Sequence, residues 1–144
     1  MKARYVFDAI PLEIARFPDH PQRISRGFTD CLVSLHRVDI AERGLTKLGK
    51  PEGFLERQIR GWADRWVRSK TEDLPAMDAL VQWLAAKLPV SQRATLVHND
   101  YKLDNVMIDS TCPYREEAVP EWELSTIGDP LVDLGVPLCY WAPP

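Results

Sequence analysis

The stretch LVHNDYKLDNVMID, residues 96–109, places ionisable and amide side chains between two short apolar runs. The runs ATLV (94–97) and NVMI (105–108) have the length and composition of strands, so the residues between them are predicted to form a loop. That loop contains His98, Asp100, Lys102, Asp104 and Asn105. Loops held by rigid elements often carry chemistry, and this one is therefore the candidate functional site.

The rest of the chain is mostly helical in pattern. Apolar residues recur at helical spacing over 21–36, 53–69 and 75–87, and Asp129–Pro130 is a typical helix start. The stretch 39–52, with its glycines and Pro51, is predicted to be a loop. A turn is expected over 109–114 and a returning strand over 116–119. The predicted fold is α+β and mostly helical: three helices, a small β-hairpin and a further helix.

Side chains outside the loop are assigned structural roles. The spacing of the three helical tryptophans predicts core packing for Trp62, Trp66 and Trp83. The helix over 75–87 is expected to turn inward its apolar residues Met77, Leu80, Val81, Leu84 and Leu88. The last helix carries Leu131, Leu134, Leu138 and Trp141. His20 and His36 are isolated in sequence and are assigned to caps or to the surface. The three cysteines, Cys31, Cys112 and Cys139, are far apart, which favours buried, reduced thiols.

Composition excludes several classes of function. A chain of 144 residues is about one domain in size, and its formal net charge of −3 gives no basic excess for nucleic-acid binding. No apolar run is long enough to span a bilayer. Asp8, Pro11 and Glu13 interrupt the N-terminal segment, so no signal peptide is predicted. We expect a cytoplasmic protein that binds neither nucleic acid nor membranes.

The loop residues favour phosphoryl transfer. His98, Asp100 and Asn105 follow the pattern H-x-D-x-x-x-x-N, and further carboxylates come after the hairpin, at Glu121, Glu123, Asp129 and Asp133. An aspartate can orient and deprotonate a hydroxyl while an asparagine oxygen binds Mg²⁺, which prefers oxygen ligands. A metal-dependent hydrolase that uses His98 and Asp100 is an alternative, but it would need more histidines than the three available. Lys102 and Asp104 are read as solvated or locally ion-paired, and Glu123 as structural.

Two motifs together resemble a known family. LVHNDYKLDNVMIDS and the later AVPEWELSTIGDPLVDLG are similar to the catalytic core of aminoglycoside phosphotransferases and choline kinase-like proteins. They are most similar to the branch found as a kinase-like domain associated with acyl-CoA dehydrogenases, which reads close to LVHGDYRLDN and VLDWELSTLGDPLADL. The resemblance runs from about residue 22 to 141. It implies a protein kinase-like fold in which ATP and Mg²⁺ serve phosphoryl transfer to a small-molecule hydroxyl.

The resemblance also assigns roles to residues. Asp100 matches the catalytic aspartate that orients the substrate hydroxyl, and Asn105 matches the metal-binding asparagine. Glu121 stands where the family has its second metal ligand, an aspartate. His98, Asp129 and Asp133 match residues that brace the catalytic loop. Asn99 replaces a frequent glycine, and asparagine tolerates unusual backbone angles better than most residues.

The chain departs from the family pattern at three points, and these decide what activity we expect. The seven glycines include no G-x-G, and we expect residues 1–144 to be a partial domain, a C-lobe portion without the N-lobe or the C-terminal helices. Such a chain would be a fragment, a truncated gene or part of a split product. Glu121 is one methylene longer than aspartate and follows Pro120. The last helix would expose apolar surface, which favours self-association. We therefore expect an inactive isolated fragment, with a degenerate, non-catalytic remnant or binding module as the alternative.

Overall fold

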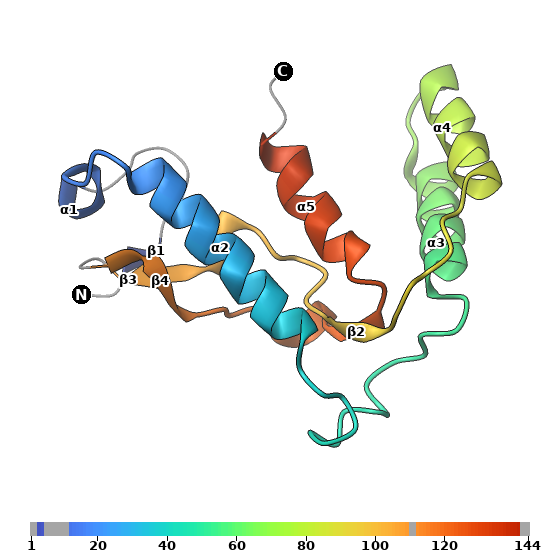
Figure 1. Ribbon diagram of the computed structural model, residues 1–144. Helices are drawn as coiled ribbons and strands as arrows, with labels where there is room; N and C mark the ends of the chain where they lie inside the picture. The colour runs from blue at the N-terminus through green and yellow to red at the C-terminus, as the bar shows by residue number, and fades with distance from the viewer. Residues whose placement is uncertain (1–2, 5–11, 110–111, 142–144) are drawn as a thin grey trace.

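The computed structural model describes residues 3–4, 12–109 and 112–141 (Figure 1). Its helices are α1 (Leu12–Ala15), α2 (His20–His36), α3 (Phe54–Ser69), α4 (Pro75–Ala86) and α5 (Leu131–Trp141). One antiparallel sheet has the order β1-β3-β4, with strands Ala3–Arg4, Met107–Asp109 and Cys112–Ala118. A second sheet pairs β2 (Thr95–Val97) with β5 (Thr126–Gly128). The predicted α+β, mostly helical architecture is confirmed.

The three long predicted helices are confirmed to within one residue at each end. Pro21 lies in the first turn of α2, where a missing backbone N–H costs nothing. Gly53 precedes α3 with φ +63°, a left-handed conformation that favours glycine. The Arg57 guanidinium reaches back to the backbone carbonyls of Lys50 and Glu52, which ties this helix start to the preceding loop.

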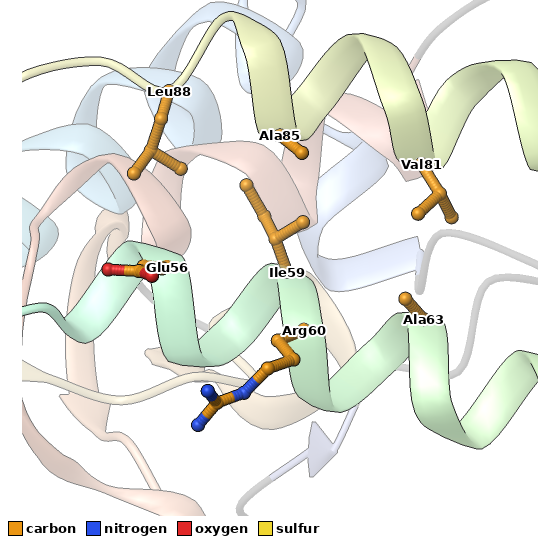
Figure 2. Close-up of a pocket in the computed structure, with 7 residues that line it drawn as sticks. All are labelled: Glu56, Ile59, Arg60, Ala63, Val81, Ala85 and Leu88. Atoms are coloured by element: carbon orange, nitrogen blue, oxygen red, sulfur yellow. The ribbon is translucent and has the colours of Figure 1, made fainter.

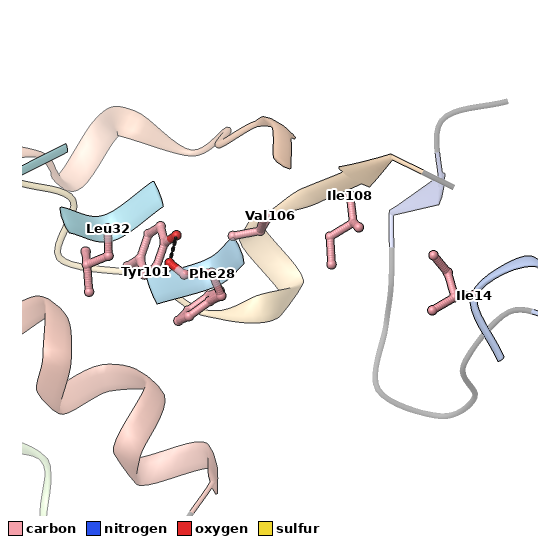
Figure 3. Close-up of a cluster of buried hydrophobic side chains, with 6 residues drawn as sticks. All are labelled: Ile14, Phe28, Leu32, Tyr101, Val106 and Ile108. Carbon is pink, nitrogen blue, oxygen red and sulfur yellow. Dashed lines mark hydrogen bonds between the residues drawn. The ribbon is translucent and has the colours of Figure 1, made fainter. Parts of the chain in front are cut away.

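The core lies between α2 and the three-stranded sheet. Its buried side chains come from α1, α2 and the residues around the loop, and they are Ile14, Phe28, Leu32, Tyr101, Val106 and Ile108 (Figure 3). The Tyr101 hydroxyl donates a hydrogen bond of 2.8 Å to the Phe28 carbonyl, and the two rings lie 4.3 Å apart. Because Tyr101 follows Asp100 directly, this packing fixes one side of the candidate loop.

Strand β2 of the β2–β5 sheet leads directly into the loop. The antiparallel register pairs Thr95 with Gly128 and Val97 with Thr126. Gly128 leaves room for the ring of Phe54, since a Cβ on Gly128 would lie 2.6 Å from it. Gly49 approaches β5 in the same way, because its Cβ would lie 2.6 Å from the Ile127 nitrogen. The connection between α2 and α3 therefore packs on β5.

The strand boundaries require corrections. The predicted turn over 109–114 was wrong at its end, since Cys112 already begins β4. The strand predicted over 105–108 begins later in the structure, at Met107 (β3). The residues Leu103–Asn105 before it form a short 3-10 helix, η1. Strand β5 was not predicted. Three residues are too few to show a period, and their partner, β2, lies far away in sequence.

The helical hairpin α3–α4 is less buried than predicted. Core packing was wrong for Trp62 and Trp83, whose exposed fractions are 63% and 58%. Trp62 instead stacks under the Arg65 guanidinium, 4.6 Å from the ring centre. None of the α4 residues is buried. These helices contact each other and lie beside the rest of the fold, so their apolar spacing reflects their own pairing (Figure 1).

The structure also tests the predictions for the cysteines and for the apolar face of α5. Cys139 is exposed, which corrects the expectation of burial, and Cys31 and Cys112 are half-buried. Helix α5 exposes Leu131, Leu134 and Leu138 as expected, while self-association through them stays a prediction. Residues 5–11 and the side chain of Trp141 lie outside the described residues. Within the described ranges, each helix is too short or too polar to cross a membrane.

Asp133 attaches the loop to α5. Its side chain is completely buried and accepts hydrogen bonds from the backbone N–H groups of His98 (2.9 Å) and Asn99 (2.7 Å). The His36 ring nitrogen Nε2, at the end of α2, lies 2.9 Å from the same carboxylate. One side chain thus connects three segments, and His36 is not the isolated cap or surface residue that was predicted.

Gly128→Ala tests the close packing of β5 on α3. The added methyl would overlap the buried Phe54 ring, and we expect a loss of about 1–3 kcal/mol in the free energy of unfolding. Gly61→Ala, inside α3 with open space around it, should instead gain about 0.5–1 kcal/mol. Urea denaturation measures both changes. Equal effects of the two substitutions would contradict this packing.

Asp133→Ala tests the attachment of the loop. It leaves the buried His98 amide, the partly buried Asn99 amide and His36 without an acceptor, so we expect a loss of about 3 kcal/mol in unfolding free energy. Asp73→Ala is the matched control, since Asp73 is exposed and pairs with Lys70, and such pairs contribute about 0–1 kcal/mol. Amide hydrogen exchange should also accelerate at His98 and Asn99. Unchanged exchange there would show that Asp133 does not hold the loop.

Candidate functional site

The candidate loop runs from His98 to Asn105, between β2 and β3, and its last three residues form η1. Asn99 adopts φ +66°, the left-handed conformation that asparagine tolerates, and its Nδ2 donates to the Leu124 carbonyl (2.7 Å). The backbone N–H of Asp100 points to Nδ1 of His98 (3.3 Å). The backbone of Asp100 is therefore held from both sides, because its carbonyl also accepts from Asn105 Nδ2 (2.9 Å).

Asp100 presents a carboxylate that is held but still reachable. Its oxygen Oδ2 accepts from Asn105 Nδ2 (2.7 Å), and Lys102 Nζ lies 2.9 Å from Oδ1 and 3.0 Å from Oδ2. The side chain is 31% exposed. The hydrogen bond to Asp100 raises the pKa of the Lys102 ammonium, which keeps it charged. The prediction that Lys102 is a local ion-pair partner is confirmed.

The two acceptors around Asn105 fix the orientation of its side-chain amide. Both the Asp100 carbonyl and Asp100 Oδ2 can only accept, so the amide nitrogen faces them. The amide oxygen consequently points away from Asp100. An oxygen in that position is a suitable cation ligand, whereas the nitrogen would not be.

His98 is buried inside the loop rather than exposed to ligands. Its Nε2 lies 2.8 Å from the Pro120 carbonyl, which only accepts, so this nitrogen carries the proton. Its Nδ1 then accepts from the Asp100 N–H. Both ring nitrogens are used, and the ring also makes an edge contact with Trp122 at 4.8 Å. His98 thereby ties Asp100 to the segment that contains Glu121.

Glu121 and Asp129 occupy different positions relative to the loop. The Pro120 carbonyl anchors the backbone just before Glu121, which has an exposed side chain and φ +67°. Asp129 is buried and accepts from the Leu131 N–H (2.8 Å), so it caps α5. Because β2 and β5 are antiparallel, Asp129 lies at the far end of β2 from His98. Its connection to the loop passes through α5 and Asp133.

Two residues that hold the loop were missed from sequence. His36 was read as isolated because its partner, Asp133, lies 97 residues away. Tyr101 was given no role from the sequence, yet it is fully buried, and this burial raises the pKa of its hydroxyl far above the usual range. The sequence offered no signal for Tyr101, because its burial depends on α2 lying against the loop. For His36 the sequence offered none.

A cavity lies elsewhere in the molecule. It has a volume of about 380 Å³ between α3 and α4, and Ile59 and Ala63 face Val81 and Ala85 across it (Figure 2). None of the loop residues lines it. Among the described residues, His, Cys, Asp and Glu do not gather in groups of three or more that could hold a metal ion.

Sequence comparison relates the chain to longer proteins. A sequence model of the phosphotransferase enzyme family matches residues 2–144. Acyl-CoA dehydrogenase family member 10 of Mus musculus is 37% identical over 88% of this chain. Acyl-CoA dehydrogenase family member 11 of Rattus norvegicus is 41% identical over 79% of it. The chain spans only 12% and 15% of those two proteins.

Solved structures share the fold. A proposed aminoglycoside phosphotransferase from Ralstonia eutropha matches 97% of this chain and 44% of its own, with a TM-score of 0.80 and 34% identity. A macrolide 2'-phosphotransferase type I matches 83% of this chain and 40% of its own, with a TM-score of 0.69 and 21% identity, a likeness of fold. With its protein kinase-like fold and a family match over almost its whole length, this chain belongs to the phosphotransferase enzyme family.

Proposed function

We propose that this chain carries the catalytic loop of an ATP- and Mg²⁺-dependent phosphotransferase that acts on a small-molecule hydroxyl. The observation that carries the proposal is the arrangement around Asp100. Its carboxylate is partly exposed, and Asn105 holds it with the amide nitrogen, which turns the amide oxygen away. An oriented base beside a free oxygen ligand is what phosphoryl transfer requires.

The donor set suits Mg²⁺. This ion prefers oxygen ligands and commonly uses one or two carboxylates together with phosphate oxygens of the substrate. Asn105, through its amide oxygen, and Glu121, through its carboxylate, are the residues that would hold it. When bound, the ion would neutralise charge on the phosphate oxygens. The buried contact between His98 and Pro120 supports this assignment, because it fixes the Glu121 backbone beside the loop.

The residues of the chain would act mainly by positioning. Asp100 orients the acceptor hydroxyl and takes its proton. His98 and Asp133 hold the loop backbone, and Asp129 supports Asp133 by capping α5. A base held in place before the substrate arrives needs no reorganisation during the reaction, which is the source of most such rate enhancement.

A non-catalytic role is the second candidate. Glu121 takes a left-handed backbone conformation after Pro120 and is exposed, which can displace its carboxylate from the position that a shorter aspartate would have. A misplacement of about 1 Å can cost on the order of 10²-fold in rate. The hydrolase alternative is disfavoured, because both ring nitrogens of His98 are used within the protein.

Asp100→Asn tests the assignment of the base. Because the seven glycines of the chain include no G-x-G, we expect phosphoryl transfer by residues 1–144 to be weak. The substitution removes the proton acceptor without changing size, so transfer should fall by about 10²–10⁴-fold. Transfer from radiolabelled ATP would be measured over sugars, amino alcohols, hydroxyacyl compounds and aminoglycosides. Robust transfer that survives the substitution would refute the proposal.

Asn105→Ala and Glu121→Asp test the metal ligands. Mn²⁺, a paramagnetic substitute for Mg²⁺, should in the presence of ATP broaden the amide NMR signals around Asn105 and Glu121. Asn105→Ala should abolish this broadening, whereas Glu121→Asp should preserve or strengthen it. Asp73→Ala, on the distant α3–α4 connection, is the control and should change nothing. Broadening centred on other residues would place the cation elsewhere.

A further inference from the structure

Lys102 makes an unusual pair with Asp100. Its side chain is only 21% exposed, and its Nζ contacts both carboxylate oxygens, at 2.9 and 3.0 Å. The same ammonium lies 5.7 Å from the centre of the Tyr140 ring, near the end of α5. Exposed ion pairs on flexible side chains usually contribute little, but this lysine is partly buried and lies only two residues from its partner in the sequence.

The hydrogen bonds distinguish the two oxygens of Asp100. An ionised carboxylate offers about four acceptor sites, two on each oxygen. Oδ2 accepts from both Lys102 and Asn105, whereas Oδ1 accepts from Lys102 alone. Three sites are therefore used, and the remaining one lies on Oδ1. The described contacts leave a hydroxyl donor one preferred place on this carboxylate.

We infer that Lys102 is a positioning residue that, together with Asn105, holds the Asp100 carboxylate so that Oδ1 receives the proton of the acceptor hydroxyl. This inference rests on the proposed function. It identifies the carboxylate oxygen that takes the proton and the lysine that holds this oxygen in place. Lys102 acts through Asp100 and is not itself a proton acceptor, because its ammonium has donors only. Tyr140 limits where that ammonium can move.

The transfer conserves atoms and charge. The acceptor hydroxyl oxygen forms a bond to the γ-phosphorus of ATP, and the bond from that phosphorus to the β,γ-bridging oxygen breaks. The electron pair of the broken bond stays on the bridging oxygen, which leaves with ADP. The hydroxyl proton passes to Oδ1 of Asp100. Lys102 stays charged and remains close to the carboxylate throughout.

Three substitutions test the inference in the 144-residue chain. Lys102→Met keeps the length of the side chain but removes its donors, and Lys102→Arg keeps donors and charge. Lys70→Met is the matched control, since Lys70 also pairs with an aspartate, Asp73 at 2.7 Å, far from the loop in sequence. Crystal structures of the wild type and the variants would locate the Asp100 carboxylate, and thermal unfolding would verify that each variant folds.

The expected outcome is specific to Lys102→Met. In that variant the Asp100 carboxylate should move by about 1 Å or occupy several conformers, a displacement large enough to matter for rate. Lys102→Arg and Lys70→Met should keep it within about 0.5 Å of its wild-type position. An unmoved carboxylate in Lys102→Met would overturn the inference, whether or not the chain transfers phosphate.

Kinetics separate this inference from the proposed function. Where wild-type transfer is measurable, Lys102→Met should lower kcat by about 10–10²-fold without changing KM for ATP, and Lys102→Arg should restore most of the rate. An equal kcat in Lys102→Met and wild type would contradict the positioning role. Absence of transfer by the wild type agrees with an inactive partial domain, whereas failure of Mn²⁺ and ATP to broaden the NMR signals around Asn105 would count against the proposed function. In both cases the crystal structures would still decide the role of Lys102.

Discussion

The structure depends most on one buried carboxylate, that of Asp133. It accepts from two consecutive backbone amides of the loop and contacts a histidine from α2. Backbone N–H groups in a buried turn are costly to leave without an acceptor, so this side chain determines the path of the chain immediately before Asp100. The cap at Asp129 and the packing of Tyr101 then fix the helix and the loop on either side.

The parts of the fold that follow from local signals could be predicted from the sequence. The helical periodicity and the Asp129–Pro130 start gave helix boundaries close to those observed. The loop between the two apolar runs was also predictable, because polar residues between short strands leave few alternatives. The roles proposed for Asp100 and Asn105 came from spacing and resemblance, and the geometry supplies a physical reason for both.

The remaining features depend on contacts between distant segments. His36 has no local partner, and only the folded chain brings it to Asp133. Strand β5 exists because β2 pairs with it, across about thirty residues that the sequence pattern does not connect. Trp62 and Trp83 have the spacing of core residues, but periodicity identifies an apolar face without saying what covers it. The burial of Tyr101 likewise requires knowing that α2 lies against the loop.

We propose that Asp100 and Asn105 divide the work of a phosphoryl-transfer site, with the amide oxygen of Asn105 turned toward a cation. A crystal structure of the chain with Mg²⁺ and a non-hydrolysable ATP analogue tests it most directly. We expect Mg²⁺ about 2.0–2.1 Å from that amide oxygen, with the Asn105 nitrogen still donating to Asp100. A bound nucleotide whose metal contacts neither Asn105 nor Glu121 would contradict it.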